Sequence, residues 1–216
     1  FAALIYQTAW TRQFAFVFGT SELAVATVLA AYMGGLAAGA HFAARLAPRI
    51  QRPVRVYASV ELGIAAAALL VPLFIDLATR LHAHLFSSTG LLAGEGGLAT
   101  MLFYLVSSFV ILLVPTALMG ATLPLLARHA VRTNEEIGTR IGSLYAINTV
   151  GAVAGTLLSG FVLLPEIGLR QTVFVAVAGN ALVFVLAAFL ATSAPLPRSF
   201  TEVASRAFPS DRRRWI

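Results

Sequence analysis

The chain has 216 residues, of which 59% are hydrophobic and only 11% are charged. A water-soluble domain of this size needs a charged surface, so the composition excludes an ordinary soluble protein and predicts one domain embedded in a lipid bilayer. The net charge of +6 includes fifteen arginines and no lysine. The arginines cluster at the ends of apolar runs, which argues against a nucleic-acid partner and for contact with anionic lipid.

Three apolar helices are predicted in the first half of the chain. The first, residues 1–19, opens at Phe1 instead of Met, which leaves room for the helix to begin upstream. Ser21 can cap the second helix, residues 22–46, and an arginine- and proline-rich turn follows it. The third helix, residues 54–81, is long enough to cross about 30 Å of hydrocarbon at about 1.5 Å per residue.

Three more helices are predicted in the second half, after a glycine- and serine-containing stretch. The fourth spans 98–119 and continues to about 128 past a proline kink, the fifth spans 141–164, and a turn at 165–169 leads to the sixth, 170–192. We expect residues 1–194 to form a transmembrane domain and residues 195–216 a basic cytoplasmic tail.

The distribution of arginine predicts the orientation of the helices. Twelve of the fifteen arginines fall in the connections after the second and fourth predicted helices and after the sixth. Arg80 and Arg170 are the ones in the other connections, and Arg12 lies within the first helix. Because arginine-rich loops stay in the cytoplasm, both chain ends are expected there.

Several strings of residues occur together in a family-like order. They are Phe1-Ala-Ala-Leu-Ile-Tyr-Gln-Thr-Ala-Trp-Thr-Arg, Thr27-Val-Leu-Ala-Ala-Tyr-Met-Gly-Gly-Leu-Ala-Ala-Gly, Glu61-Leu-Gly, Pro115-Thr-Ala-Leu-Met-Gly-Ala-Thr-Leu-Pro-Leu-Leu-Ala-Arg and Gly142-Ser-Leu-Tyr-Ala-Ile-Asn-Thr-Val-Gly-Ala-Val-Ala-Gly. Over residues 1–192, the combination resembles the membrane-embedded N-terminal domain of bacterial spermidine synthase-like proteins, also described as fused major-facilitator and spermidine synthase proteins. The family usually has an acidic residue where this chain has Gln7.

The resemblance implies an all-α fold of six transmembrane helices, arranged like half of a major facilitator as three plus three, in the bacterial inner membrane. It also implies an aminopropyltransferase-like domain downstream. The glycine-rich loop for decarboxylated S-adenosylmethionine and the aspartates that would grip a polyamine have no counterpart in this sequence. We therefore expect no catalytic residue, cofactor or metal site in this chain, whose role is that of a non-catalytic anchoring or scaffolding module in polyamine metabolism.

Glycine pairs four residues apart mark two of the predicted helices. Gly35 and Gly39 lie in the second helix, and Gly151 and Gly155 lie in the fifth. Small residues at this spacing let helices pack closely, and the repetition suits an inverted repeat of three helices. A dimer interface or a moving gate is the alternative interpretation of the same glycines.

Ionisable residues within predicted spans are costly and call for partners. Arg12 lies at the membrane level of Glu22, Asp76 and Glu166, which predicts a structural ion pair, with anion or substrate binding as the alternative. Glu61 can accept hydrogen bonds from the basic turn or from Tyr145 and Asn148, or it can relay protons or bind a cation. Asn148 and Asn180 are expected to bond across helices. His82 and His84 are expected to be solvated loop residues without a metal.

Two further functions remain open besides the scaffolding module. One is a small major-facilitator-like transporter that works as a homodimer, although a polyamine carrier should have several carboxylates along its path. The other is an accessory subunit of a larger membrane complex. Nucleotide-binding, serine-hydrolase and zinc-protease motifs do not occur in the sequence, so a membrane hydrolase is unsupported.

Overall fold

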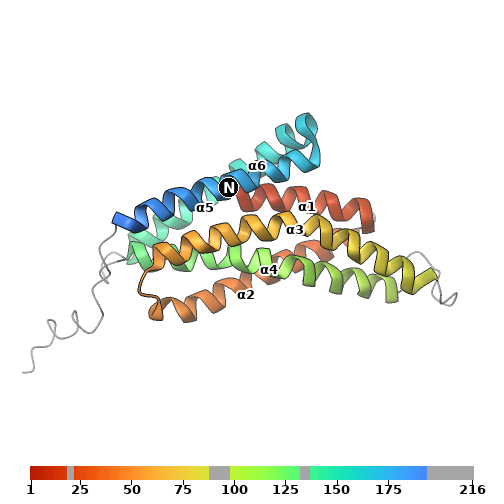
Figure 1. The fold of residues 1–216 in the computed structure, drawn as a ribbon, viewed down its shortest axis with the longest axis horizontal. Helices are drawn as coiled ribbons and strands as arrows, with labels where there is room; N and C mark the ends of the chain where they lie inside the picture. Colours follow the sequence, from red (N-terminus) through yellow and green to blue (C-terminus); the bar gives the residue numbers. More distant parts are fainter. Residues whose placement is uncertain (19–21, 88–97, 132–136, 194–216) are drawn as a thin grey trace, which may run out of the picture.

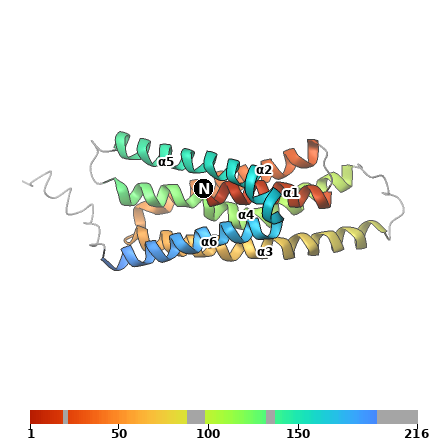
Figure 2. The ribbon, with the colours of Figure 1, turned by 90° about the horizontal axis from the view of Figure 1, so that it is seen from above.

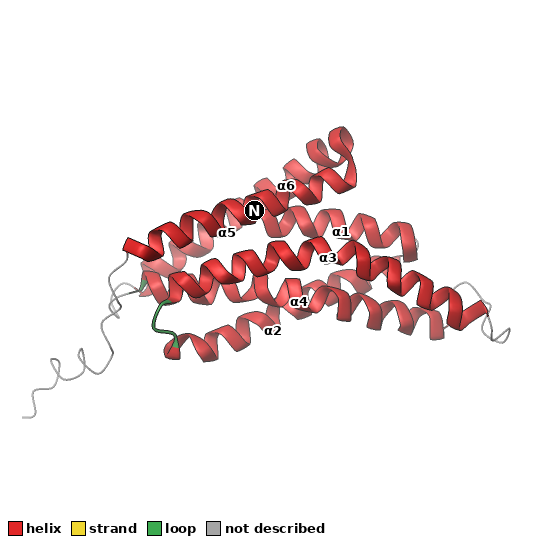
Figure 3. Cartoon of the chain, in the orientation of Figure 1, coloured by secondary structure: helices red, strands yellow, loops and turns green. Residues whose placement is uncertain are grey.

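A computed structural model describes residues 1–18, 22–87, 98–131 and 137–193, which form an all-helical bundle without strands (Figures 1 and 3). The helices in these ranges are α1 (Ala2–Phe18), α2 (Glu22–Leu46), α3 (Pro53–Ser87), α4 (Leu98–Ala130), α5 (Ile137–Leu158) and α6 (Leu164–Ser193). A 3₁₀ turn, η1 (Ala47–Arg49), follows α2, and a π-helical turn, η3 (Ser159–Leu163), joins α5 to α6.

The helices agree with the predicted all-α class, but α3 and α4 end later, and α5 and α6 begin earlier, than predicted. The bounds of α2 are those expected from the sequence. α3 continues to Ser87, so His82 and His84 lie in a helix and not in the predicted loop. The reason is a contact with α4, because the His82 ring packs 5.3 Å from Phe103 and 5.1 Å from Tyr104. The Ser21 cap and residues 195–216 lie outside the described ranges.

The chain reverses direction near the start of α6 (Figures 1 and 2). Gly168 has φ 76° and ψ 176°, a conformation that residues with a side chain rarely adopt. It lies within α6, between the first turn of this helix and the long remainder that runs back along the bundle. The Thr172 hydroxyl donates to the Gly168 carbonyl at 2.7 Å. The predicted turn at 165–169 therefore has a definite cause, which is one glycine with positive φ.

Four described stretches are long and apolar enough to cross a membrane: Val25–Arg49, Pro53–Leu85, Leu102–Ala130 and Ile137–Thr192. The last contains the reversal at Gly168, so it folds into two legs. Large apolar side chains also project outward from the bundle, including Phe16 and Phe161, each 78% exposed, and Phe189, 72% exposed. A surface of this kind fits contact with lipid.

Helix α1 fills the centre of the bundle with aromatic side chains. Tyr6, Trp10 and Phe14 are buried on it, and they belong to one apolar core together with side chains from α2, α3, α4 and α6. The Tyr32 hydroxyl of α2 donates to the Ala3 carbonyl at 2.8 Å and lies 3.6 Å from the sulfur of Met119. This hydroxyl therefore joins α1, α2 and α4.

Helices α2 and α4 lie with their backbones in direct contact (Figure 1). A Cβ added to Gly39 would lie 2.6 Å from Ala117 Cα and would overlap the Ala117 carbonyl. A Cβ on Gly35, also in α2, would overlap Thr116 of α4. From the other side, a Cβ on Gly120 of α4 would overlap the Leu36 carbonyl of α2. The two helices can approach this closely only because these positions have no side chain.

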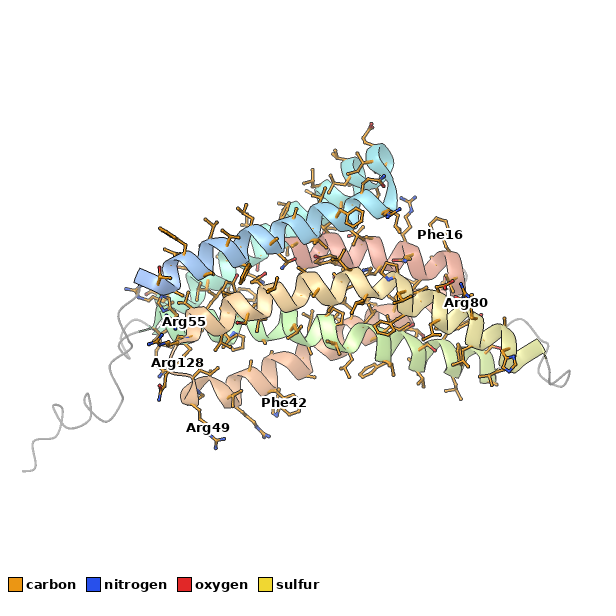
Figure 4. All side chains as sticks on the ribbon, in the orientation of Figure 1. Phe16, Phe42, Arg49, Arg55, Arg80 and Arg128 are labelled. Atoms are coloured by element: carbon orange, nitrogen blue, oxygen red, sulfur yellow. The ribbon has the colours of Figure 1, made fainter. Side chains whose placement is uncertain are left out.

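The arginine side chains gather at one end of the bundle. In Figure 4, Arg49, Arg55 and Arg128 lie together at the end where α2 and α4 finish and α3 begins, and Arg80 lies toward the opposite end. We call the first of these the arginine-rich end. Its arginines come from connections that are far apart in the sequence, as the distribution of arginine predicts.

Candidate polar site between three helices

Glu61 is the acidic side chain that the described structure buries. It lies in the third turn of α3, where it is 6% exposed, whereas the carboxylates of Glu22, Asp76 and Glu166 are exposed. At about 1.5 Å per residue, Glu61 is about 9 Å along the helix axis from Arg55. If Arg55 marks the headgroup level, the Glu61 carboxylate lies within the depth of the hydrocarbon.

Asn180 of α6 is the hydrogen-bond partner that the structure gives to Glu61. Its Nδ2 donates to Glu61 Oε2 at 2.5 Å, and Asn180 itself is 6% exposed. The side chain of Tyr57, one turn earlier in α3, also interacts with this carboxylate. The cross-helix bond expected for Asn180 is therefore present, and it connects α3 to α6, which pack along each other (Figure 2).

The third wall of the site comes from α1. The Tyr6 side chain is fully buried, and its hydroxyl lies within electrostatic range of Glu61. Its ring stacks on that of Trp10, with centroids 5.0 Å apart and an interplanar angle of 18°. These two residues are four apart in sequence, so they lie on one face of α1, and their burial shows that this face points into the bundle.

Three polar atoms of Tyr6, Trp10 and Asn180 are buried without a hydrogen-bond partner. They are the Tyr6 hydroxyl, Trp10 Nε1 and Asn180 Oδ1. Leaving a buried donor or acceptor unsatisfied costs about 1–3 kcal/mol, so a further partner for these atoms would be stabilising. Together they offer one amide acceptor, one hydroxyl and one indole donor close to the Glu61–Asn180 pair. We refer to Glu61, Asn180, Tyr6 and Trp10 as the polar site.

The partners expected for Glu61 on α5 lie elsewhere. Tyr145 is 63% exposed, and Asn148 is also exposed, so neither reaches the carboxylate. Asn148 makes no cross-helix hydrogen bond within the described ranges, contrary to the expectation. The first half of α5 lies on the outside of the bundle, which places both side chains on its surface.

Arg12 also differs from expectation. Its side chain is exposed and forms no ion pair with Glu22, Asp76 or Glu166 in the described part of the chain. Asp76 instead binds Arg80 one turn later in α3, with Arg80 Nε 2.9 Å from Asp76 Oδ2. Both of these side chains are largely exposed, so the pair lies at the surface and outside the polar site.

The glycines of the fifth helix face α1. A Cβ on Gly155 would overlap the Phe1 carbonyl, and one on Gly151 would lie 3.3 Å from the Phe1 nitrogen. Gly35 and Gly39 instead face α4, so the two glycine pairs pack against different helices of the same chain.

Metal binding has no support in the described residues, where no three histidine or acidic side chains come together. The sequence interpretation identified Glu61 but missed Tyr6 and the pairing with Asn180. The available signal was spacing, because Tyr6 and Trp10 are four residues apart, as are Tyr57 and Glu61.

Comparison of the chain with family models, curated proteins and solved structures finds no match. The function is therefore argued from the residues and their arrangement.

Proposed function

We propose that the chain is a six-span, non-catalytic membrane module of a spermidine synthase-like protein, which anchors or scaffolds its partner domain at the bacterial inner membrane. The arginine-rich end lies on the cytoplasmic side, whereas Phe1 lies partway along the bundle, beside Gly155 of α5 (Figure 1). The observation that supports the six-span architecture is the pattern of contacts between helices. The main contacts made by α1, α2 and α3 have counterparts among those made by α4, α5 and α6.

This exchange maps α1 onto α4, α2 onto α5 and α3 onto α6. The contact of α2 with α4 then becomes the contact of α5 with α1, and α3 with α4 becomes α6 with α1. The contact of α3 with α6 maps onto itself. These five contacts follow the exchange, although the small contact of α1 with α3 has no counterpart of similar extent between α4 and α6. They support two three-helix repeats, and an odd number of spans per repeat makes the repeats inverted.

The glycine pairs follow the same exchange. Gly35 and Gly39 of α2 pack against α4, and Gly151 and Gly155 of α5 pack against Phe1, next to the start of α1. Corresponding glycines on corresponding interfaces support a common design for the two halves. They also favour close packing within one chain over a dimer interface as the role of these glycines.

The orientation can be tested by cysteine labelling, because the chain has no cysteine of its own. In bacterial cells, Arg80→Cys should react with a membrane-impermeant maleimide from outside, and Arg49→Cys should react only after permeabilisation. Ser159→Cys, at a fully buried position, is the control and should stay unlabelled in both conditions. Labelling of Arg49→Cys and Arg80→Cys from the same side would reject the six-span topology.

The scaffolding role has a separate test, which is the reading frame of the gene. A nucleoside-binding, aminopropyltransferase-like domain encoded after position 216 is expected. A full-length protein containing only membrane helices would reject the scaffolding role and would favour the transporter, for which the buried Glu61 carboxylate is the supporting observation.

A further inference from the structure

Beyond the scaffolding role, we propose that the polar site binds a small organic ammonium ion that carries one positive charge and at least two N–H groups. Glu61 supplies the charge, Asn180 Oδ1 and the Tyr6 oxygen supply further acceptors, and the stacked rings of Tyr6 and Trp10 form an aromatic wall.

The first argument is electrostatic. A buried carboxylate is stable when a cation compensates it, and Glu61 forms no ion pair with an arginine or histidine in the described structure. A cation bound beside Glu61 would supply this compensation.

The second argument is the count of hydrogen-bonding atoms. With Asn180 and Tyr57 as its neighbours, the carboxylate still keeps lone pairs for a further donor, and Asn180 Oδ1 and the Tyr6 hydroxyl have no partner. An ammonium group has donors but no acceptor, so it satisfies this surplus of acceptors. A hydroxyl or ether oxygen elsewhere on the ligand would accept from Trp10 Nε1, the remaining unpartnered donor.

The third argument concerns the kind and number of charges. Aromatic side chains favour weakly hydrated organic cations, and the described residues bring no cluster of acidic or histidine ligands that would suit a metal ion. Glu61 is the one acidic side chain buried among the described residues, so a bound monovalent ion leaves the site neutral. A polyamine would bring positive charges that the site cannot compensate.

The experiment is isothermal titration of the purified protein in detergent micelles with n-butylammonium chloride at neutral pH. We expect saturable binding at one site. Tetramethylammonium, which has no N–H group, should bind at least about tenfold more weakly, because hydrogen bonds to charged groups are each worth roughly a factor of ten. Putrescine should bind no more tightly than n-butylammonium.

Two variants test the residues, with a third as control. Glu61→Gln keeps a side chain that can bond to Asn180 but removes the charge, and it should weaken binding by about tenfold or more. Asp76→Asn removes an exposed carboxylate of the same helix and should leave binding unchanged. Equal binding by wild type and Glu61→Gln, or equal losses in Glu61→Gln and Asp76→Asn, would overturn the proposal.

Tyr6→Phe separates ligand binding from folding. In the structure the Tyr6 hydroxyl has no partner, so its removal should leave thermal stability unchanged or raise it, and this variant remains informative if Glu61→Gln fails to assemble. We expect n-butylammonium to bind to Tyr6→Phe several-fold more weakly than to wild type. Unchanged binding by Tyr6→Phe, absence of saturable binding by wild type, or tighter binding of putrescine than of n-butylammonium would each reject the site as described.

Discussion

The backbone contact between α2 and α4 predicts a large effect for the smallest possible substitution, Gly39→Ala. The added Cβ would lie 2.6 Å from Ala117 Cα, whereas carbon atoms in contact prefer about 3.5–4.0 Å. The helices must therefore separate by about 1 Å, and a gap of this size forfeits a quarter to a half of each dispersion contact along the interface. The obstacle is backbone, so no side chain can rotate away to make room.

We expect overpacking at Gly39 to cost about 3 kcal/mol, the upper part of the usual range, because the clash is with backbone. Replacing glycine by alanine within a helix returns about 1 kcal/mol of helix propensity. The net loss of about 2 kcal/mol in the free energy of unfolding corresponds to a roughly thirtyfold fall in the folding equilibrium constant.

The assay is unfolding in mixed micelles by titration with a denaturing detergent, followed by far-ultraviolet circular dichroism. The matched control is Gly142→Ala in α5, where nothing lies within 4 Å of the added Cβ, so helix propensity should leave the protein as stable as wild type or more stable. Equal unfolding midpoints for the Gly39→Ala and Gly142→Ala variants would refute the reasoning, because the α2–α4 contact would then tolerate a side chain.

Two further substitutions test the reversal and the surface. Gly168→Ala should lower the free energy of unfolding by about 2 kcal/mol, because a side chain disfavours φ 76° and ψ 176°. The loss should appear as a lower melting temperature in micelles. An unchanged melting temperature would mean that the turn does not need glycine. Arg12→Gln should change the free energy of unfolding, measured by titration with a denaturing detergent, by less than about 0.5 kcal/mol. The reason is that Arg12 is exposed and forms no described ion pair. A loss above about 1 kcal/mol would contradict that surface position.

The helices themselves follow closely from the sequence. Apolar runs separated by glycine, proline and arginine predicted each helix, and the bounds of α2 agree to the residue. The end of α3 was missed because hydropathy falls before His82, and only the rings of Phe103 and Tyr104 on α4 explain why the helix continues. A tertiary contact of this kind has no local signal in the sequence.

The polar site was less predictable, because depth in a membrane was easier to infer than rotation about a helix axis. Arg12 was expected to meet an acidic partner at its own membrane level, but it is two residues from Trp10, about 200° around the helix, and therefore faces away from the core. Glu61 and Asn180 were each identified as polar groups within spans, yet their pairing depends on how α3 and α6 turn toward each other.

The first half of α5 has a consequence for the choice of solvent. Between residues 137 and 150 every side chain except that of Leu144 is exposed, so in a bilayer the acyl chains take the place that neighbouring helices occupy elsewhere. Exchange of lipid for short-chain detergent would remove those packing partners from this half-helix first. The conformation of α5 should therefore depend on the length and order of the acyl chains. The α2–α4 contact should depend on them less, because the backbones of these two helices pack directly against each other.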